Sequence, residues 1–402
     1  MLDESLLDSP EALARADTHG QLRAAAEAGA HVRTAARRAE ESALSELRPD
    51  GRPRAVLVAG SGPGTACTAD LLGAFTNGAM PVTLLRPYGP LAAPDALRWA
   101  LPGWTGPLDL LIVATSDGTE PGLTALIEQA YRRGCTVVSV SPPSAPVAAM
   151  TGETHGLAVP LHVGADAVRE PPSVSRPHSG GDGSNGQPTP PTVAQSASPA
   201  VLWPLVTPLL VLFDRLGLFP ADPSALQSLA DRLDHVAERC GPAVATYTNP
   251  AKSLATELTG TLPLLWTEGA VAGAVGHRCA SAFAALPGLP VLTAALPGAM
   301  AEHSRLLAGS LAAASDPEDF FRDRVEEPES LRARVLFLRE QATYEHSAAV
   351  AVRELTYAHE VPLSELEPVD GSSPLAAAAE LIATVDFTAV YLALADGGPS
   401  WS

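Results

Sequence analysis

Short apolar runs that end in glycine or a hydroxyl residue, each leading into a helical segment, recur along this chain. The first run is Arg54–Gly60, and similar runs follow at 81–85, 108–114, 135–140 and 157–161. Segments with helical character separate most of them, for example 65–75 and 122–133. Continuous apolar runs of this length are typical of strands buried on both faces. The alternation therefore predicts a parallel sheet covered by helices on both sides.

The same alternation returns after an interruption. Residues 164–198 are crowded with Pro, Gly and Ser and have almost no apolar side chains, which is typical of a disordered linker. Beyond it we expect strands at 262–266, 290–293 and 334–338, and helices at 222–240, 347–357 and 374–395. We therefore predict an α/β protein with two doubly wound parallel-sheet domains, residues 1–165 with leading helices and residues 200–402, joined by a disordered linker over 166–199.

Charge and hydropathy limit the partners. The chain carries 26 basic and 45 acidic residues, a formal net charge of −19, so repulsion argues against a nucleic acid partner. The acidic start is unlike a secretory signal, and the apolar stretch 200–213 is too short to span a bilayer. We expect a cytoplasmic protein without a membrane partner.

Four cysteines are too far apart in sequence to form a CxxC pair: Cys67, Cys135, Cys240 and Cys279. In a reducing compartment they are expected to be buried free thiols. A structural zinc site is the alternative, although the Cys/His spacing matches no zinc pattern. We predict no metal and no cofactor.

Two strand-to-helix turns offer the clearest ligand chemistry. They read V-A-G-S-G-P-G-T at 58–65 and V-A-T-S-D-G-T-E at 113–120. Helix N-termini at the carboxyl edge of a sheet present N–H groups to anions, glycine allows close approach, and hydroxyls donate hydrogen bonds. Together the turns predict a phosphate site formed by Gly60, Ser61, Thr115, Ser116 and Thr119.

Two other interpretations of these turns stay open. A dinucleotide fingerprint would need a third glycine where Thr65 stands and an acidic residue after the second strand, where the sequence has Leu84-Leu85-Arg86. The turns could also be ordinary connections of an α/β fold without a ligand. Two such turns in one domain favour phosphate binding over either alternative.

These turns resemble those of sugar isomerase (SIS) domains. Residues 115–120 resemble the S-G-N-T-x-E turn, and Gly60-Ser61-Gly62 lies where the family has G-G-S. Residues 248–255 resemble the N-P-A-K-x-L-A stretch of bifunctional phosphoglucose/phosphomannose isomerases, and 387–393 resemble their F-x-S-V-Y-L-A helix. The resemblance implies two SIS-type α-β-α sandwiches and a homodimer. It also implies interconversion of glucose or mannose 6-phosphate with fructose 6-phosphate through an enediol.

The resemblance also suggests catalytic residues, with one gap. His303 matches the family histidine that opens the sugar ring, but Ala285 stands where the family has its glutamate base. An alanine cannot abstract a proton, so Glu268 and Glu302 are the candidate substitutes.

Two basic residues complete the implied site. Arg278 matches the family's arginine near the base, and Lys252 lies within the N-P-A-K stretch, where a structural role is the alternative. The family's phosphate-clamping arginine segment and its C-terminal lysine helix have no clear counterpart. The sequence therefore leaves open a non-catalytic sugar-phosphate sensor or regulatory protein on the same scaffold.

Overall fold

The computed structural model describes residues 4–42, 44, 51–91, 93–161, 198–308, 332–341 and 347–395. Most of the predicted linker therefore lies outside the described residues. Its last two residues, Ser198 and Pro199, begin helix α9 (Pro199–Arg215), where the Ser198 side chain accepts a hydrogen bond from the amide of Ala200. The domain limits drawn from the sequence stay a prediction.

The first half forms a five-stranded parallel sheet in the order β2-β1-β3-β4-β5. The strands lie where the apolar runs predict them: β1 (Ala55–Ala59), β2 (Val82–Leu85), β3 (Asp109–Ala114), β4 (Thr136–Ser141) and β5 (Leu157–Pro160). Residues that alternate along β1, β3 and β4 face two separate apolar clusters, because neighbouring side chains of a strand point to opposite faces. Helices α6 (Pro121–Arg132) and α7 (Pro146–Glu153) cover one face, and α5 (Gly62–Phe75) covers the other.

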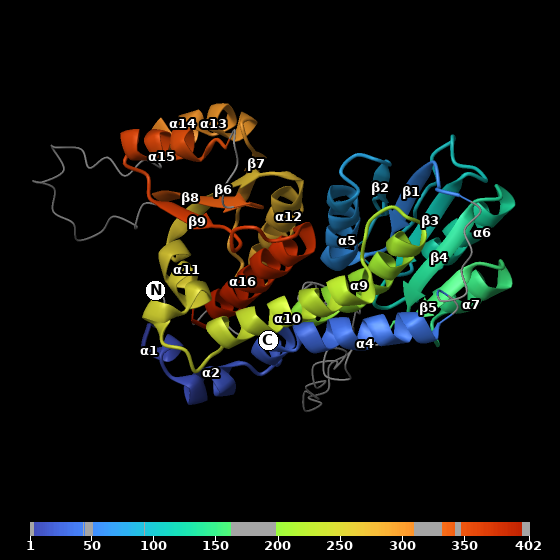
Figure 1. The fold of residues 1–402 in the computed structure, drawn as a ribbon, viewed down its shortest axis with the longest axis horizontal. Coiled ribbons are helices and arrows are strands. Elements are labelled where there is room, and N and C mark those ends of the chain that lie inside the picture. The colour runs from blue at the N-terminus through green and yellow to red at the C-terminus, as the bar shows by residue number, and fades with distance from the viewer. Residues whose placement is uncertain are drawn as a thin grey trace, which may run out of the picture.

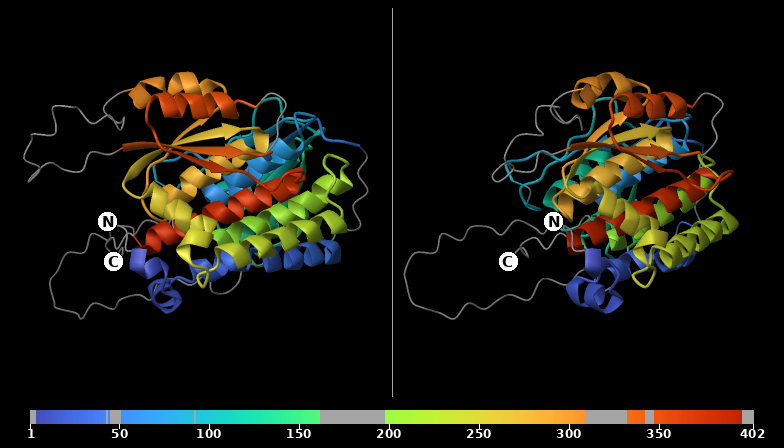
Figure 2. Two further views of the ribbon diagram at one scale, coloured as in Figure 1. Left: turned by 60° about the vertical axis from the view of Figure 1, so that its left-hand side comes forward. Right: turned by 90° about the vertical axis from the view of Figure 1, so that its left-hand side faces the viewer.

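The second half forms a four-stranded parallel sheet in the order β7-β6-β8-β9. Its strands are β6 (Thr261–Glu268), β7 (Leu292–Ala295), β8 (Arg332–Arg339) and β9 (Leu363–Leu366). One face packs under α13 (Gly298–Glu302), α14 (Ser304–Ala308) and α15 (Ala349–Ala358). The other face packs on α11 (Pro250–Leu258), α12 (Ala270–Ala285) and α16 (Pro374–Ala395), so helices sandwich the sheet (Figure 2). The α/β class with two all-parallel sheets is confirmed.

Long helices join the two sheets. Helix α4 (Ala28–Glu41) packs along α9 and α10 (Pro223–Cys240), α10 packs on α16, and α5 packs on α12 (Figure 1). The short helices α1 (Glu4–Leu7), α2 (Pro10–Ala16) and α3 (Gln21–Ala26) precede α4, and the 3₁₀ turn η3 (Thr246–Thr248) precedes α11.

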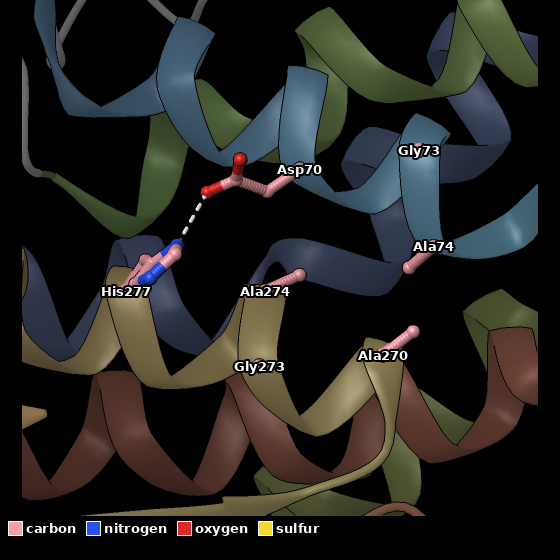
Figure 3. A pocket seen from close by; sticks show the side chains of 7 residues that line it. All are labelled: Asp70, Gly73, Ala74, Ala270, Gly273, Ala274 and His277. Carbon is pink, nitrogen blue, oxygen red and sulfur yellow. Dashed lines mark hydrogen bonds and ion pairs between the residues drawn. The ribbon is translucent and has the colours of Figure 1, made fainter. Parts of the chain in front are cut away.

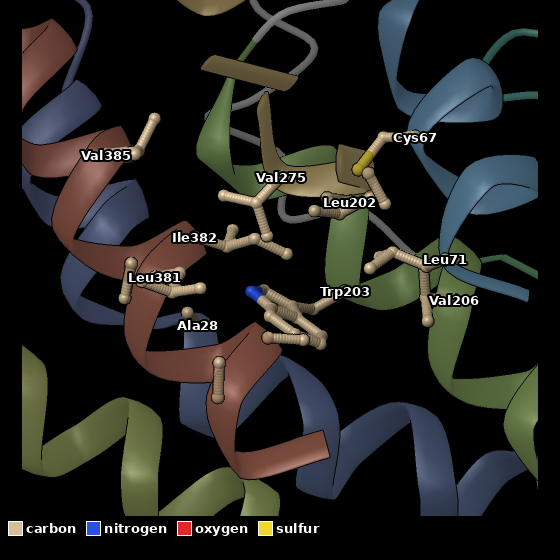
Figure 4. Packing of buried hydrophobic residues seen from close by; sticks show 14 of the residues in the cluster. Ala28, Cys67, Leu71, Leu202, Trp203, Val206, Val275, Leu381, Ile382 and Val385 are labelled. Atoms are coloured by element: carbon tan, nitrogen blue, oxygen red, sulfur yellow. The ribbon is translucent and has the colours of Figure 1, made fainter. Parts of the chain in front are cut away.

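Trp203 of α9 lies at the centre of this junction. It is 2% exposed, and Figure 4 places it among Leu71, Val275 and Ile382, which come from three other helices. The apolar residues 201–219, with prolines among them, predict an interrupted helix here. The structure instead keeps α9 continuous through Pro204 and Pro208, which lack the N–H that an interior helical position donates. Burial of nearly every side chain of α9 offsets the missing hydrogen bonds.

By length and composition, helix α16 is apolar enough to cross a membrane. However, 94% of its most apolar 18-residue stretch is buried within the protein. It thus serves as a core helix that contacts α10, α11 and α12.

Candidate functional site at the edge of the five-stranded sheet

The two predicted turns lie side by side because β1 and β3 are neighbours in the sheet. The end of β1 approaches the end of β3 closely at Gly60, which has a positive φ of 157°. A Cβ atom there would lie 2.0 Å from the carbonyl oxygen of Ala114, so only glycine fits. The Thr65 hydroxyl, in the first turn of α5, donates to the same carbonyl at 2.7 Å. This glycine therefore brings the two turns together.

The turns meet on a carboxylate that sequence reasoning did not single out. The Ser61 hydroxyl, from the first turn, donates to Glu120 Oε1. The Thr115 hydroxyl, from the second turn, lies 3.3 and 3.4 Å from the two oxygens of the same carboxylate. Glu120 is only 1% exposed. Its position in the T-S-D-G-T-E segment was the available signal, but the partner on the other turn lies 59 residues away in sequence.

The hydroxyls of the second turn differ in how many hydrogen bonds they already make within the protein. Thr115 Oγ1 also accepts from the amides of Asp117 and Gly118 at 3.3 and 3.1 Å, which shapes the turn. The Thr119 hydroxyl is exposed and donates to Asp117 at 2.8 Å. Ser116 is half-buried and, within the described part of the chain, its hydroxyl has no hydrogen-bond partner. Ser116 is therefore the predicted hydroxyl that is ready to donate to a ligand.

His303, the predicted acid, lies in the second half and has a defined hydrogen-bonding state. It is 8% exposed, and its Nδ1 accepts a hydrogen bond of 2.8 Å from Trp266 Nε1. An indole N–H can only donate, so Nδ1 carries no proton and the neutral ring is protonated on Nε2. Burial lowers the pKa of His303, and the nearby Glu302 opposes this shift. The geometry favours a neutral imidazole with one N–H left to donate.

The two candidate bases have different surroundings. Glu268, at the end of β6, accepts hydrogen bonds from the Ser347 hydroxyl at 2.7 Å and from the Ala348 amide at 2.6 Å. Both of its oxygens are thus engaged at the start of α15. Glu302 is exposed and is the last residue of α13, directly before His303. Of the pair, Glu302 is the carboxylate with room to move.

Helix α12 also begins at an internal carboxylate. Glu340 Oε2 accepts from the Val271 amide at 2.6 Å, and a Cβ atom at Gly269 would lie 2.1 Å from the Glu340 carboxyl carbon. With Glu268 at α15, carboxylates of the protein thus occupy two helix N-termini of the second half. Negative charge is favourable at a helix N-terminus, so both contacts stabilise the fold.

Arg278 and Lys252 lie inside the protein, away from any open surface. The Arg278 guanidinium, at most 2% exposed, donates from Nε and Nη2 to the two oxygens of Asp386 at 3.1 and 3.0 Å. Lys252, the single lysine, is buried, and its Nζ donates to the carbonyls of Leu7, Pro242 and Val244 at 2.6, 2.8 and 2.7 Å. Lys252 thus ties helix α1 to the second half, the structural alternative considered for it.

A small open cavity lies between α5 and α12 (Figure 3). Its volume is about 290 Å³, and glycine and alanine residues line most of it. His277 Nδ1 lies 2.9 Å from Asp70 Oδ2 at its wall, and this hydrogen bond raises the pKa of His277. None of the residues predicted for the site lines this cavity.

The four cysteines are buried and free, as expected from the sequence. Burial raises the pKa of Cys67 to about 12 and the pKa values of Cys135 and Cys240 to about 11. Within the described ranges, no three His, Cys, Asp or Glu side chains come together as a metal site would require.

Comparison with known proteins supports the resemblance in the second half. Residues 247–398 match the bacterial phosphoglucose isomerase C-terminal SIS domain. A search of curated proteins finds no match to the sequence.

Solved structures share the fold. A Clostridium difficile 630 protein assigned as a phosphosugar isomerase is 10% identical with a TM-score of 0.57, and the match covers 93% of this chain and 92% of that one. A Silicibacter pomeroyi DSS-3 protein with the same assignment is 15% identical with a TM-score of 0.55, covering 93% and 97%. The C-terminal domain of glucosamine-fructose-6-phosphate aminotransferase from Francisella tularensis is 8% identical with a TM-score of 0.51, covering 94% and 97%. Residues 247–398 therefore match a SIS domain of the bacterial phosphoglucose isomerase C-terminal type, and the chain shares its two-sheet fold with proteins assigned as phosphosugar isomerases.

Proposed function

We propose that this protein binds a hexose 6-phosphate at the carboxyl edge of its five-stranded sheet. The observation that carries the proposal is the meeting of two hydroxyl-bearing turns, since Ser61 and Thr115 both reach Glu120. The Ser116 hydroxyl and the N-termini of α5 and α6 offer donors beside this point. In the four-stranded half, Glu268 and Glu340 already occupy the N-termini of α15 and α12. That contrast favours the first sheet as the anion site.

We further propose aldose–ketose isomerisation as the reaction, interconverting glucose or mannose 6-phosphate with fructose 6-phosphate. His303, protonated on Nε2, would donate to the ring oxygen during ring opening. Glu302, exposed next to it, would take the proton that moves between C1 and C2. The match of residues 247–398 to a phosphoglucose isomerase domain supports this assignment.

A second candidate function is a sugar-phosphate sensor or regulatory protein without turnover. It is favoured by Glu268, whose two oxygens are engaged at α15, and by Ala285, which replaces the family's base. Arg278 is likewise held by Asp386 instead of facing solvent. Both candidates share the same phosphate site and differ only in proton transfer.

Incubation with fructose 6-phosphate in D₂O, followed by NMR, separates the two functions. Isomerisation through an enediol places deuterium at C2 of the aldose product. Saturable binding without exchange would establish the sensor. If the protein neither binds nor exchanges any of the three hexose 6-phosphates, the proposal is refuted.

The remaining parts of the proposal concern assembly and location. We propose a homodimer, since the SIS resemblance implies sites completed across subunits, and a cytoplasmic location. Sedimentation equilibrium tests the first, and fractionation of the source cells tests the second. A monomer at all concentrations would contradict the proposed assembly.

A further inference from the structure

Trp266 is a buried tryptophan that holds the ring of His303 through one hydrogen bond. It lies in β6, between β7 and β8, and is fully buried. Its ring belongs to an apolar cluster that includes Ala294 of β7 and Phe337 of β8. Because a side chain packed in this way cannot turn freely, the direction of its N–H is fixed. That N–H donates to His303 Nδ1 at 2.8 Å.

This hydrogen bond keeps a proton away from Nδ1 of His303. An indole nitrogen can only donate, whereas an imidazole nitrogen can donate or accept. If Nδ1 became protonated, two donors would face each other across 2.8 Å at a side chain that is 8% exposed. A buried donor without an acceptor is unfavourable. The imidazolium form and the Nδ1–H tautomer are therefore both disfavoured, and the Nε2–H tautomer remains.

Burial acts in the same direction as the tryptophan. It lowers the pKa of His303, and the negative charge of Glu302 opposes this effect. Glu302 is exposed at the end of α13, so solvent weakens its interaction with the ring. The hydrogen bond and the burial of His303 thus both favour a neutral ring.

His277 shows the opposite arrangement within the same chain. Its Nδ1 lies 2.9 Å from Asp70 Oδ2. An ionised carboxylate can only accept, so Nδ1 of His277 carries a proton. The hydrogen bond with Asp70 also raises the pKa of His277. The partner of Nδ1 therefore distinguishes the two histidines, an indole donor for His303 and a carboxylate acceptor for His277.

We propose that Trp266 is a positioning residue that keeps His303 a neutral Nε2–H donor, which stabilises charge on a sugar oxygen by a hydrogen bond and keeps its own proton. The inference rests on the proposed function and deepens it. When Glu302 takes the proton from carbon, the electron pair of that C–H bond moves to the neighbouring carbonyl oxygen. His303 Nε2–H donates to this oxygen, and no bond is made or broken at the imidazole. A neutral imidazole can stabilise an enediolate in this way.

Nitrogen NMR of the histidine rings tests the tautomer directly. The full chain is labelled with ¹⁵N-histidine, and the signals that disappear in His303→Gln identify His303. The wild-type ring should carry a proton on Nε2 and none on Nδ1. It should stay neutral down to about pH 5.5, one unit below the usual histidine pKa of about 6.5. In Trp266→Phe, which keeps an aromatic ring but lacks the N–H, His303 should populate the Nδ1–H tautomer and become charged at a higher pH than in wild type.

Trp203→Phe is the matched control, because it makes the same change at another buried tryptophan. Trp203 is 2% exposed and belongs to a different apolar cluster from Trp266. Its replacement should lower the Tm, as Trp266→Phe does, but leave the ring signals of His303 unchanged. The signals of His277 should be the same in both variants. If Trp266→Phe does not fold, the titration of the wild-type ring decides the proposal.

Addition of fructose 6-phosphate shows whether the Nε2 proton faces the sugar. The Nε2–H signal of His303 should shift and should saturate together with binding. In an isomerase assay with glucose 6-phosphate, Trp266→Phe should lower kcat about tenfold and change KM less than about twofold, because the phosphate is held at the other sheet. The wild-type kcat should not fall between about pH 7 and pH 9, where an imidazolium acid would have lost its proton.

The outcomes separate this inference from the proposed function. A proton on Nδ1 of the neutral wild-type ring, or the same His303 titration in wild type and Trp266→Phe, would overturn the positioning role whether or not sugar binds. Saturable binding without a shift of the Nε2–H signal would overturn the role of His303 at the sugar, while the phosphate site stands. If no hexose 6-phosphate binds, the proposed function fails, and the spectra of the ligand-free protein still decide the role of Trp266.

Discussion

Replacement of Asp386 by alanine separates a structural role of Arg278 from a role in substrate binding. The two side chains are 1% and 4% exposed, and the guanidinium donates to both carboxylate oxygens at 3.1 and 3.0 Å. Asp386→Ala leaves the guanidinium buried without its counter-ion. Breaking a buried ion pair from one side costs about 3–5 kcal/mol. That is a large part of the roughly 5–15 kcal/mol by which proteins are stable.

Urea denaturation followed by circular dichroism measures this loss, and a double variant supplies the control. Arg278→Met with Asp386→Leu replaces the pair by apolar side chains of similar size and should recover most of the stability. The double variant should also keep glucose 6-phosphate binding if Arg278 serves only the fold. A loss below about 1 kcal/mol in Asp386→Ala would refute the energetic argument. A stable double variant that no longer binds would instead place Arg278 at the substrate.

Three further predictions concern single side chains. Ser116→Ala should weaken glucose 6-phosphate binding by about 1.5–3 kcal/mol in calorimetry, because it removes a hydrogen bond to a charged group; unchanged affinity would exclude this site. Burial lowers the pKa of His303 in the folded protein. Its contribution to the free energy of unfolding should therefore be complete above about pH 6.5, the pKa of histidine in the unfolded chain, and should be lost as the pH falls below that value. His303→Gln should therefore give a flatter dependence of Tm on pH, and an identical profile would contradict this assignment. Thiol reagents at about pH 8 should label none of the four cysteines until the protein is denatured, since burial raises their pKa values; rapid labelling of the native protein would contradict their burial.

Much of the fold follows from local sequence pattern. Strands β1, β3 and β4 are continuous apolar runs, and the structure has them within a residue or two of the predicted limits. Helix α11 begins at Pro250 with Asn249 as its N-cap, as the N-P-A-K segment predicts. Such elements carry their signal within a few residues. Strand β9 was missed because L-S-E-L has neither an apolar run nor enough length to show alternation.

The site was less predictable because its contacts join distant parts of the chain. The two turns could be recognised, but the meeting of Ser61 with Glu120 depends on the order of strands in the sheet. The pairing of Arg278 with Asp386 spans 108 residues and gave no signal in either segment. The sequence therefore suggests the hydroxyls as a group, but it does not tell where their protons are directed.

A crystal structure of the protein soaked with fructose 6-phosphate tests the central claim most directly. The account predicts the phosphate at the carboxyl edge of β1 and β3, with the Ser116 hydroxyl within about 3 Å of a phosphate oxygen. It also predicts that the Glu120 carboxyl group lies beside Ser61 in the same crystal structure. A phosphate bound at the edge of the four-stranded sheet, or in the cavity between α5 and α12, would contradict the account.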